Sequence, residues 1–246
     1  MGRGPSIEGR KNAEDGKRAK VFTKLIREIT VAARHGADPA ANSRLRTAID
    51  KALSANMSKD TVERAVKRGA GADGADHMQE LRYEGYGPSG VALIIDCMTD
   101  NPQRTVADVR HALAKHGGNL GTSGSVAFQF SRIGELAIAT TDGAAESKVF
   151  DAALEAGADD VQSANGESIV LCAADQVEPI KLALTAAGLS PLRADIVMRA
   201  ANRVSVEGEV AETLVDLLEW LEELDDVQEV FANFDVSEEL MEQLVG

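Results

Sequence analysis

The stretch RKNAEDGKRAKVFTKLIREITVAAR, residues 10–34, decides the fold of the N-terminal part of this chain. On a helix that turns about 100° per residue, its apolar residues share one face and its cations share the opposite face. The apolar face comprises Phe22, Leu25, Ile26, Ile29 and Ala33, and the opposite face comprises Lys17, Lys20, Lys24, Arg27 and Arg34. One face can therefore pack on a small core, while the row of cations suits the regularly spaced phosphates of a nucleic acid. A solvated surface helix is the alternative interpretation.

The uneven charge of the chain favours the nucleic-acid interpretation. The 246 residues contain 26 Lys and Arg against 40 Asp and Glu, a net charge of −14. Residues 1–71 nevertheless contain 16 basic and 8 acidic residues, so the remainder contains 10 basic and 32 acidic residues. A basic arm of net charge +8 beside an acidic body of net charge −22 is typical of polyanion binding. Because the acidic body repels phosphate, we expect it to help confine a polyanion to the arm.

Composition indicates a globular, cytoplasmic protein. With 44% hydrophobic residues the chain can bury several small cores. No apolar run approaches the ~20 residues of a membrane span, and the basic N-terminus lacks the apolar segment of a secretory signal. The two cysteines, Cys97 and Cys172, lie far apart in apolar segments, which indicates buried thiols in a reducing compartment.

Cap and turn signals divide the basic region into helices and a linker. A second helix is expected after Asn42 and a third after Ser58, because both residue types cap helix N-termini. We expect Gly69 at the C′ position that ends the third helix. The small and polar residues 70–78 predict a linker.

Beyond the linker the hydrophobic periodicity indicates strands and helices in alternation. Residues 91–98 form an apolar strand and residues 103–116 a helix. A second strand is expected over 126–130, with Phe128 and Phe130 pointing into the core. These elements make one β-α-β unit.

A ferredoxin-like pattern follows. Residues 135–198 read β-α-β-β-α-β, with Asn165-Gly166 as the turn of the central hairpin. A last β-α-β unit spans 203–234, and a terminal helix is expected over 237–245. Because the first and last β-α-β units together make another ferredoxin-like set, we predict that one domain is inserted in the other. A single larger mixed sheet is the alternative.

The predicted domains are therefore three. They are a basic helical nucleic-acid-binding domain with its linker over 1–78, a split ferredoxin-like domain over 79–132 plus 205–246, and an inserted ferredoxin-like domain over 133–204. The fold class is α+β: an N-terminal three-helix domain followed by two ferredoxin-like α/β domains.

Motifs of catalysis and cofactor binding are missing from the sequence. The four histidines (His35, His77, His111, His116) lack metal-ligand spacing, and neither cysteine belongs to a CxxC pair. Walker A, GxSxG and Rossmann glycine patterns are absent as well. We therefore predict no enzyme activity, no metal site and no small-molecule cofactor.

The glycine-rich loop GGNLGTSGS, residues 117–125, allows two interpretations. Its backbone N–H groups can cradle a phosphate, or its glycines can simply end a helix and turn the chain into the next strand. We favour the second, because the helix precedes this loop whereas phosphate loops usually precede a helix.

Several long segments carry a resemblance to a known family. They are KVFTKLIREI (20–29), DPAANSRLR (38–46), ANMSKD (55–60), YEGYGP (83–88), GVA (90–92), TDNPQRT (99–105) and the loop 117–126. Through these motifs, which cover nearly the whole chain, the sequence resembles the YebC/PmpR family. The resemblance implies an N-terminal helical domain and two α/β domains. It also implies a cytoplasmic, DNA-binding transcriptional regulator, although a mitochondrial relative acts in translation and bacterial members are linked to ribosomes stalled at proline-rich stretches.

We therefore predict a nucleic-acid-binding regulatory protein that acts through its basic helical domain. The predicted contact residues are Arg10, Lys11, Lys17, Arg18, Lys20, Lys24, Arg27 and Arg34. The preferred partner is DNA, and the alternative is a ribosome-associated translation factor that holds ribosomal or transfer RNA. Because cations on a helix face contact the phosphate backbone, changing Lys17, Lys20, Lys24 and Arg27 together to Glu is expected to abolish binding and leave the fold intact.

Overall fold

The computed structural model describes residues 7–71 and 78–236, with side chains from residue 18 onward. The predicted terminal helix over 237–245 lies outside these residues, as does most of the predicted linker.

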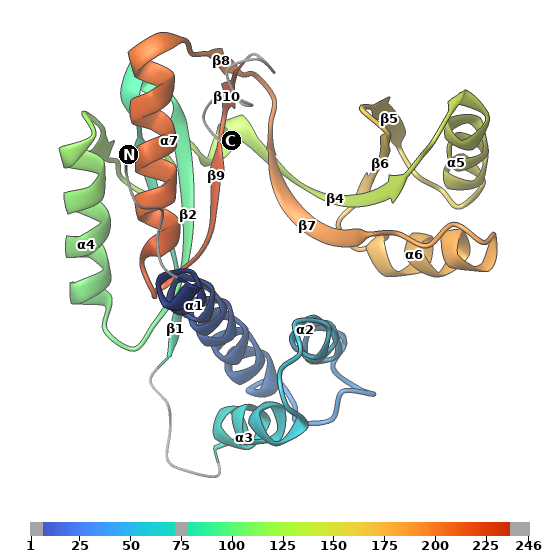
Figure 1. Ribbon diagram of the computed structural model, residues 1–246, viewed down its shortest axis with the longest axis horizontal. Coiled ribbons are helices and arrows are strands. Elements are labelled where there is room, and N and C mark those ends of the chain that lie inside the picture. Colours follow the sequence, from blue (N-terminus) through green and yellow to red (C-terminus); the bar gives the residue numbers. More distant parts are fainter. Residues whose placement is uncertain (1–6, 72–77, 237–246) are drawn as a thin grey trace. The chain divides into compact units, whose positions relative to one another are not determined.

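The basic region forms helices α1 (Ile7–Ala33), α2 (Ser43–Ser54) and α3 (Lys59–Gly69), as Figure 1 shows. The two predicted N-caps are confirmed. The side chain of Asn42 accepts a hydrogen bond from the N–H of Leu45 at 3.0 Å, and that of Ser58 accepts one from Thr61 at 3.3 Å. Each cap satisfies a backbone donor that has no partner within its helix.

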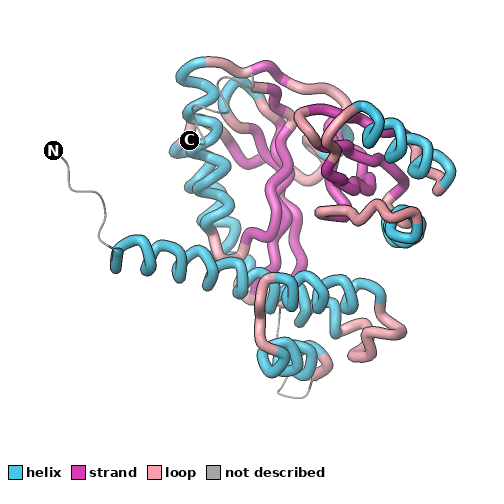
Figure 2. Tube along the Cα trace, turned by 45° about the vertical axis from the view of Figure 1, so that its right-hand side comes forward, coloured by secondary structure: helices cyan, strands magenta, loops and turns pink. Residues whose placement is uncertain are grey.

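A small apolar core joins the three helices. Its fully or largely buried residues are Ile29, Ala32, Ala33, Leu45, Ala48, Ala52, Met57, Val62 and Ala65. The residues that α1 contributes come from its C-terminal half, and the N-terminal turns of α1 run out beyond α2 and α3 (Figure 2).

Gly69 has a role other than the predicted one. It is the last residue of α3 instead of the C′ residue, and Gly71 adopts the left-handed conformation with φ +86°. A Cβ atom on Gly69 would lie 2.2 Å from the carbonyl oxygen of Thr30 and 2.8 Å from the Cβ of Ala33. Glycine is therefore required here because α1 and α3 approach each other closely.

The first sheet is antiparallel, with strand order β3-β1-β2-β9. It comprises β1 (Gln79–Tyr86), β2 (Ala92–Thr99), β3 (Asn119–Leu120) and β9 (Val227–Ala232), with a short 3-10 turn, η1 (Pro88–Gly90), between the first two. Helices α4 (Pro102–Lys115) and α7 (Gly208–Glu223) pack on it. A separate parallel pair joins β8 (Val204–Ser205) to β10 (Phe234–Asp235).

Two predictions about this sheet are wrong. Strand β1 was not expected, because its sequence QELRYEGY is largely polar. The structure explains this composition, since β3 covers only a short part of its outer edge and its Arg82 pairs with Asp96 on the neighbouring strand at 2.6 Å. The strand expected over 126–130 is largely a 3-10 turn, η2 (Ala127–Gln129), in which Phe128 is 79% exposed instead of facing the core. Phe130 is buried as predicted, but it is the first residue of a later strand.

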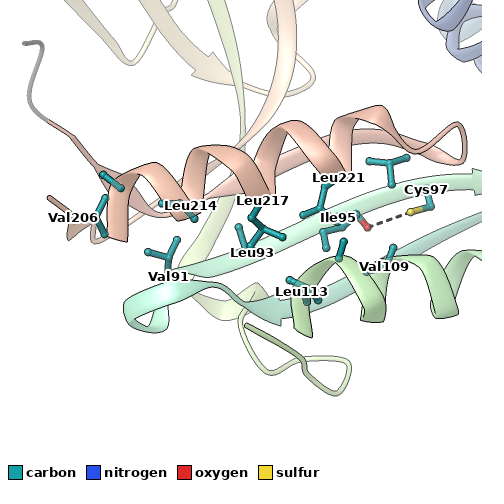
Figure 3. Packing of buried hydrophobic residues seen from close by; sticks show 13 residues of the cluster. Val91, Leu93, Ile95, Cys97, Val109, Leu113, Val206, Leu214, Leu217 and Leu221 are labelled. Atoms are coloured by element: carbon teal, nitrogen blue, oxygen red, sulfur yellow. Dashed lines mark hydrogen bonds between the residues drawn. The ribbon is translucent and has the colours of Figure 1, made fainter. Parts of the chain in front are cut away.

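The core of this sheet lies between β2 and the two helices (Figure 3). Alternate residues of the β2 segment, Val91, Leu93, Ile95 and Cys97, are buried against α4 and α7. The helices contribute Val109, Ala112, Leu113, Ala211, Leu214, Leu217 and Leu221. Each fully buried Val, Leu or Ile side chain among them stabilises the fold by about 1.5–3 kcal/mol.

The second sheet has the strand order and alternation of a ferredoxin-like domain. Its elements are β4 (Phe130–Ala139), α5 (Gly143–Glu155), β5 (Asp160–Ala164), β6 (Glu167–Ala173), α6 (Val177–Ala186) and β7 (Arg193–Ala200). The strands are antiparallel in the order β5-β6-β4-β7. The predicted hairpin turn is confirmed, because Asn165 and Gly166 both have positive φ, 52° and 79°.

The chain divides into two compact units, Met1–Val126 with Val204–Gly246, and Ala127–Arg203. The second unit is continuous in sequence and interrupts the first. Its first strand begins at Phe130, so the boundary expected at residue 133 falls within β4. Three N-terminal helices followed by two antiparallel sheets confirm the predicted α+β fold class.

Candidate nucleic-acid interface

Positive charge gathers on the helical domain. Residues 18–71 contain 12 Lys and Arg against 5 Asp and Glu. Because the apolar residues of the three helices are used in their common core, these charges lie on the outside of the domain. Phosphate backbones are bound by cations displayed in this way.

The outer part of α1 carries the first four predicted contact residues. Arg10, Lys11 and Lys17 belong to the helix, but their side chains are not among those described. The guanidinium of Arg18 is exposed and lies 5.4 Å from the centroid of the Phe22 ring. This cation–π contact leaves the guanidinium donors of Arg18 at the surface.

The next two cations of the row contact the C-terminal end of α7. The Nζ of Lys20 lies 3.3 Å from Glu223, and the Nζ of Lys24 donates to the carbonyl oxygen of Glu222 at 3.0 Å. Burial lowers the pKa of Lys24, and the Glu222 carboxylate only partly offsets this effect. Part of the acidic remainder therefore contacts the helical arm and occupies two of the cations predicted to meet phosphate.

Arg27 departs furthest from the predicted exposed row. Its side chain is only 16% exposed and its guanidinium lies 2.7 Å from Asp226. The same guanidinium donates to the carbonyl oxygens of Met98, at 3.0 Å, and of Asp225. A side chain held by three acceptor atoms, one on β2 and two in the segment before β9, has the contacts of a structural residue.

Asp226 is the centre of a buried polar cluster. We define the Asp226 cluster as Asp226, Arg27, Thr99, Arg104 and Thr105. Arg104 donates to both carboxylate oxygens of Asp226, and its Nη2 lies 2.8 Å from Oδ2. The hydroxyls of Thr99 and Thr105 donate to the same Oδ2, at 3.2 and 2.8 Å respectively. Burial raises the pKa of Asp226, but hydrogen bonds from Arg104 and Thr105 and the charge of Arg27 outweigh it and hold the pKa below its ordinary value. The carboxylate therefore remains charged and joins α1, β2, α4 and β9.

The last predicted cation, Arg34, contacts the segment that follows the linker. Its guanidinium donates to the carbonyl oxygen of Met78. Nearby, Arg44 forms a bidentate pair with Glu80, and their hydrogen bond raises the pKa of Arg44 and lowers that of Glu80. Sequence reasoning did not single out Arg44, because its partner lies 36 residues away.

Helix α3 adds cations that the sequence analysis did not include among the contact residues. Lys59, Arg64, Lys67 and Arg68 are exposed, and so are Asp60 and Glu63 on the same helix. Arg64 donates to the carbonyl oxygen of Asp60 at 3.2 Å, within its own helix. This face is thus mixed in charge.

The glycine-rich loop 117–125 is bound to a carboxylate of the protein itself. Glu84, on β1, is 5% exposed and accepts hydrogen bonds from the N–H groups of Gly124, at 2.7 Å, and Val126, at 2.8 Å. Its backbone carbonyl accepts another from Gly121 at 2.8 Å. These are N–H groups that a phosphate cradle would need, so the geometry favours the structural interpretation of the loop.

Glu84→Gln should loosen this loop, because an amide keeps one acceptor oxygen and turns a donor towards the second backbone N–H. We expect amide hydrogen exchange at Gly124 and Val126 to accelerate by about one to two orders of magnitude, the equivalent of a lost hydrogen bond to a charged group. Glu80→Gln, on the same strand, is the matched control and should leave both amides unchanged. Unchanged exchange in Glu84→Gln would contradict the anchoring role.

The described residues contain no group of three or more His, Cys, Asp or Glu side chains that could hold a metal ion. Both cysteines are buried free thiols, and burial raises the pKa of Cys97 to about 12, which suppresses the reactive thiolate. His111 and His116 both contact Trp220 edge-on, and their ring centroids lie 6.2 and 5.5 Å from that of Trp220.

Within the part of the chain that the structure describes, no helix is long and apolar enough to cross a membrane.

Comparison with known proteins covers both halves of the chain. Residues 4–72 match the family model described as the TACO1/YebC protein N-terminal domain, and residues 78–234 match that of the TACO1/YebC second and third domain.

Whole relatives agree with these domain matches. A probable transcriptional regulatory protein of Xanthomonas oryzae pv. oryzae is 58% identical over 238 residues, which span 96% of this chain and 98% of the relative. One of Stenotrophomonas maltophilia is 55% identical over 239 residues, with the same coverage. The crystal structure of a conserved hypothetical protein from Aquifex aeolicus has a TM-score of 0.83 and 41% identity, over 92% of this chain and 93% of that chain.

Proposed function

Because the chain belongs to the TACO1/YebC family, we propose that it is a DNA-binding transcriptional regulator that holds the phosphate backbone through its N-terminal helical domain. The observation that carries the proposal is the separation of charge, with 12 cations against 5 acids over residues 18–71 in a chain of net charge −14. The names of the relatives, probable transcriptional regulatory proteins, supply the biological role.

Cations of this kind predict a particular mode of binding. Lysine and arginine on a helix face contact phosphate oxygens, which position a protein on a duplex but carry no sequence information. Sequence preference is then modest, and the affinity depends steeply on salt because each phosphate contact releases a condensed counterion. The acidic remainder limits non-specific contact elsewhere on the molecule.

We assign the contacts with phosphate to the outer part of α1. The proposed residues are Arg10, Lys11, Lys17 and Arg18, with Lys20 and Lys24 beside them. Arg27 and Arg34, which donate to Asp226 and to the carbonyl oxygen of Met78, serve instead to hold α1 against the sheet domain. The proposed interface is thus smaller than the row predicted from the helical periodicity.

A binding competition tests the proposal. Labelled duplex DNA and purified ribosomes are offered to the protein at physiological salt, and each complex is quantified. We expect the duplex to bind, with an affinity that falls by orders of magnitude over a few-fold rise in salt. Co-sedimentation with ribosomes together with feeble duplex binding would overturn the proposal in favour of a translation factor.

A further inference from the structure

An acidic turn of this protein occupies part of the face proposed to bind phosphate. We define the acidic turn as Glu222-Glu223-Leu224-Asp225-Asp226, which comprises the last two residues of α7 and the three residues that join it to β9. Lys20, Lys24 and Arg27 follow one another along one face of α1, and each contacts this turn. The side chains of these three cations therefore contact carboxylate and carbonyl oxygens of the protein itself.

The contacts of the turn are those that a nucleic acid would replace. Lys20 meets the carboxylate of Glu223 at 3.3 Å, and Lys24 meets the carbonyl oxygen of Glu222 at 3.0 Å. The charges of Glu222 and Asp225 act on Lys24 as well. A phosphate offers the same chemistry, an anionic oxygen that accepts hydrogen bonds from ammonium groups.

The turn contains one fixed part and one exchangeable part. Asp226 is 6% exposed in its side chain and is held by Arg104, Thr99 and Thr105 as well as by Arg27. The Glu223 side chain, by contrast, is 72% exposed, and that of its partner Lys20 is 42% exposed. Exposed ion pairs contribute little to stability and exchange readily with other ions. The Lys20–Glu223 ion pair can thus be given up while the Asp226 cluster remains.

We propose that the acidic turn competes with nucleic acid for Lys20 and Lys24 and thereby lowers the affinity of the helical domain for phosphate. This inference rests on the proposed function and adds an intramolecular competitor to it. Binding of a nucleic acid along α1 displaces the carboxylate of Glu223 from Lys20 and leaves Arg27 paired with Asp226. The protein is therefore weaker as a polyanion binder than its cations alone would make it.

The test neutralises the exchangeable part of the turn. The variant Glu222→Gln/Glu223→Gln/Asp225→Asn keeps Asp226 and every backbone carbonyl. Its matched control, Glu209→Gln/Glu212→Gln/Asp216→Asn, removes the same charges from the N-terminal end and the middle of α7, roughly 9 to 21 Å away along the helix, beyond the ~8 Å screening length. We expect the turn variant to bind a duplex of about 20 base pairs roughly three- to tenfold more tightly than the control. The difference should shrink as salt is raised.

A coupling measurement shows whether the effect is local. Lys20→Gln/Lys24→Gln is introduced into the wild type and into the turn variant, and duplex affinity is measured for all four proteins. Competition predicts a larger loss of affinity in the turn variant, where the two lysines are available to phosphate, than in the wild type.

Every outcome decides the question. Tighter binding by the turn variant than by its control, with the predicted coupling, supports the inference. Equal binding by the turn variant and the control overturns it and leaves the proposed function standing, because the wild type still binds. If none of the proteins binds the duplex, the proposed function fails and the inference fails with it.

Discussion

Replacing Asp226 with alanine is expected to lower the free energy of unfolding by about 3 kcal/mol or more. The change removes the carboxylate that Arg27 and Arg104 share and leaves the partly buried Arg27 guanidinium without its ion-pair partner. Removing one member of a buried pair costs more than the pair itself contributes, because the remaining charge loses both its partner and water. Urea denaturation of the whole protein measures the change.

Two controls separate the Asp226 cluster from a general charge effect. Glu223→Gln removes an exposed carboxylate from the same turn and should change the free energy of unfolding by less than about 1 kcal/mol.

Asp226→Asn should also alter how the free energy of unfolding depends on pH. Because folding lowers the pKa of Asp226, its contribution is complete above the ordinary value of 3.8 and is lost as pH falls through the folded pKa. The wild type therefore loses this contribution in acid, and the Asp226→Asn variant has none to lose. Equal stability of the wild type and Asp226→Ala at neutral pH would show that the cluster is not required.

Neutralising the outer cations of α1 is expected to have the largest effect on nucleic-acid binding. The variant Arg10→Gln/Lys11→Gln/Lys17→Gln/Arg18→Gln should bind duplex DNA at least about a hundredfold more weakly at physiological salt. If all four contact phosphates, the slope of log affinity against log salt should fall in magnitude by about 3.6. Fluorescence anisotropy over a salt series measures both quantities.

A matched variant checks that the location of the charges matters. The control variant is Arg110→Gln/Arg132→Gln/Lys148→Gln/Lys181→Gln. It also removes two arginines and two lysines, but from the α/β part of the chain. Both variants then have the same net charge, so a non-specific effect of charge would weaken them equally. Equal losses of affinity in the two variants would count against an interface on α1. A circular dichroism spectrum identical to that of the wild type shows that each variant is folded.

The structure also corrects the charge reversal suggested by the helical pattern. Lys17, Lys20, Lys24 and Arg27 share one face in sequence, and their joint reversal was expected to leave the fold intact. The Arg27 guanidinium now lies 2.7 Å from the Asp226 carboxylate. Arg27→Glu would replace that guanidinium with a second carboxylate facing Asp226. Two like charges at this depth repel strongly, so that reversal would disturb the fold and its effect on binding would be uninterpretable.

Much of the fold follows from patterns between neighbouring residues. The caps at Asn42 and Ser58 and the Asn165-Gly166 turn depend only on the residue itself and the backbone a few positions away. The apolar periodicity of α1 and β2 likewise reflects which side faces a core. The sequence also carries the separation of charge between residues 1–71 and the remainder, because net charge needs no coordinates.

Tertiary structure alone decided which cations are available. Arg27 and Asp226 are 199 residues apart, and nothing within either local pattern indicates that they meet. A cation on an amphipathic helix looks the same in sequence whether it faces phosphate, water or a carboxylate of its own chain. The polar strand β1 escaped prediction for a related reason, since its place in the sheet is set by hydrogen bonds to β2 and β3. Local periodicity assigns a residue to a face, but only the folded chain determines what that face meets.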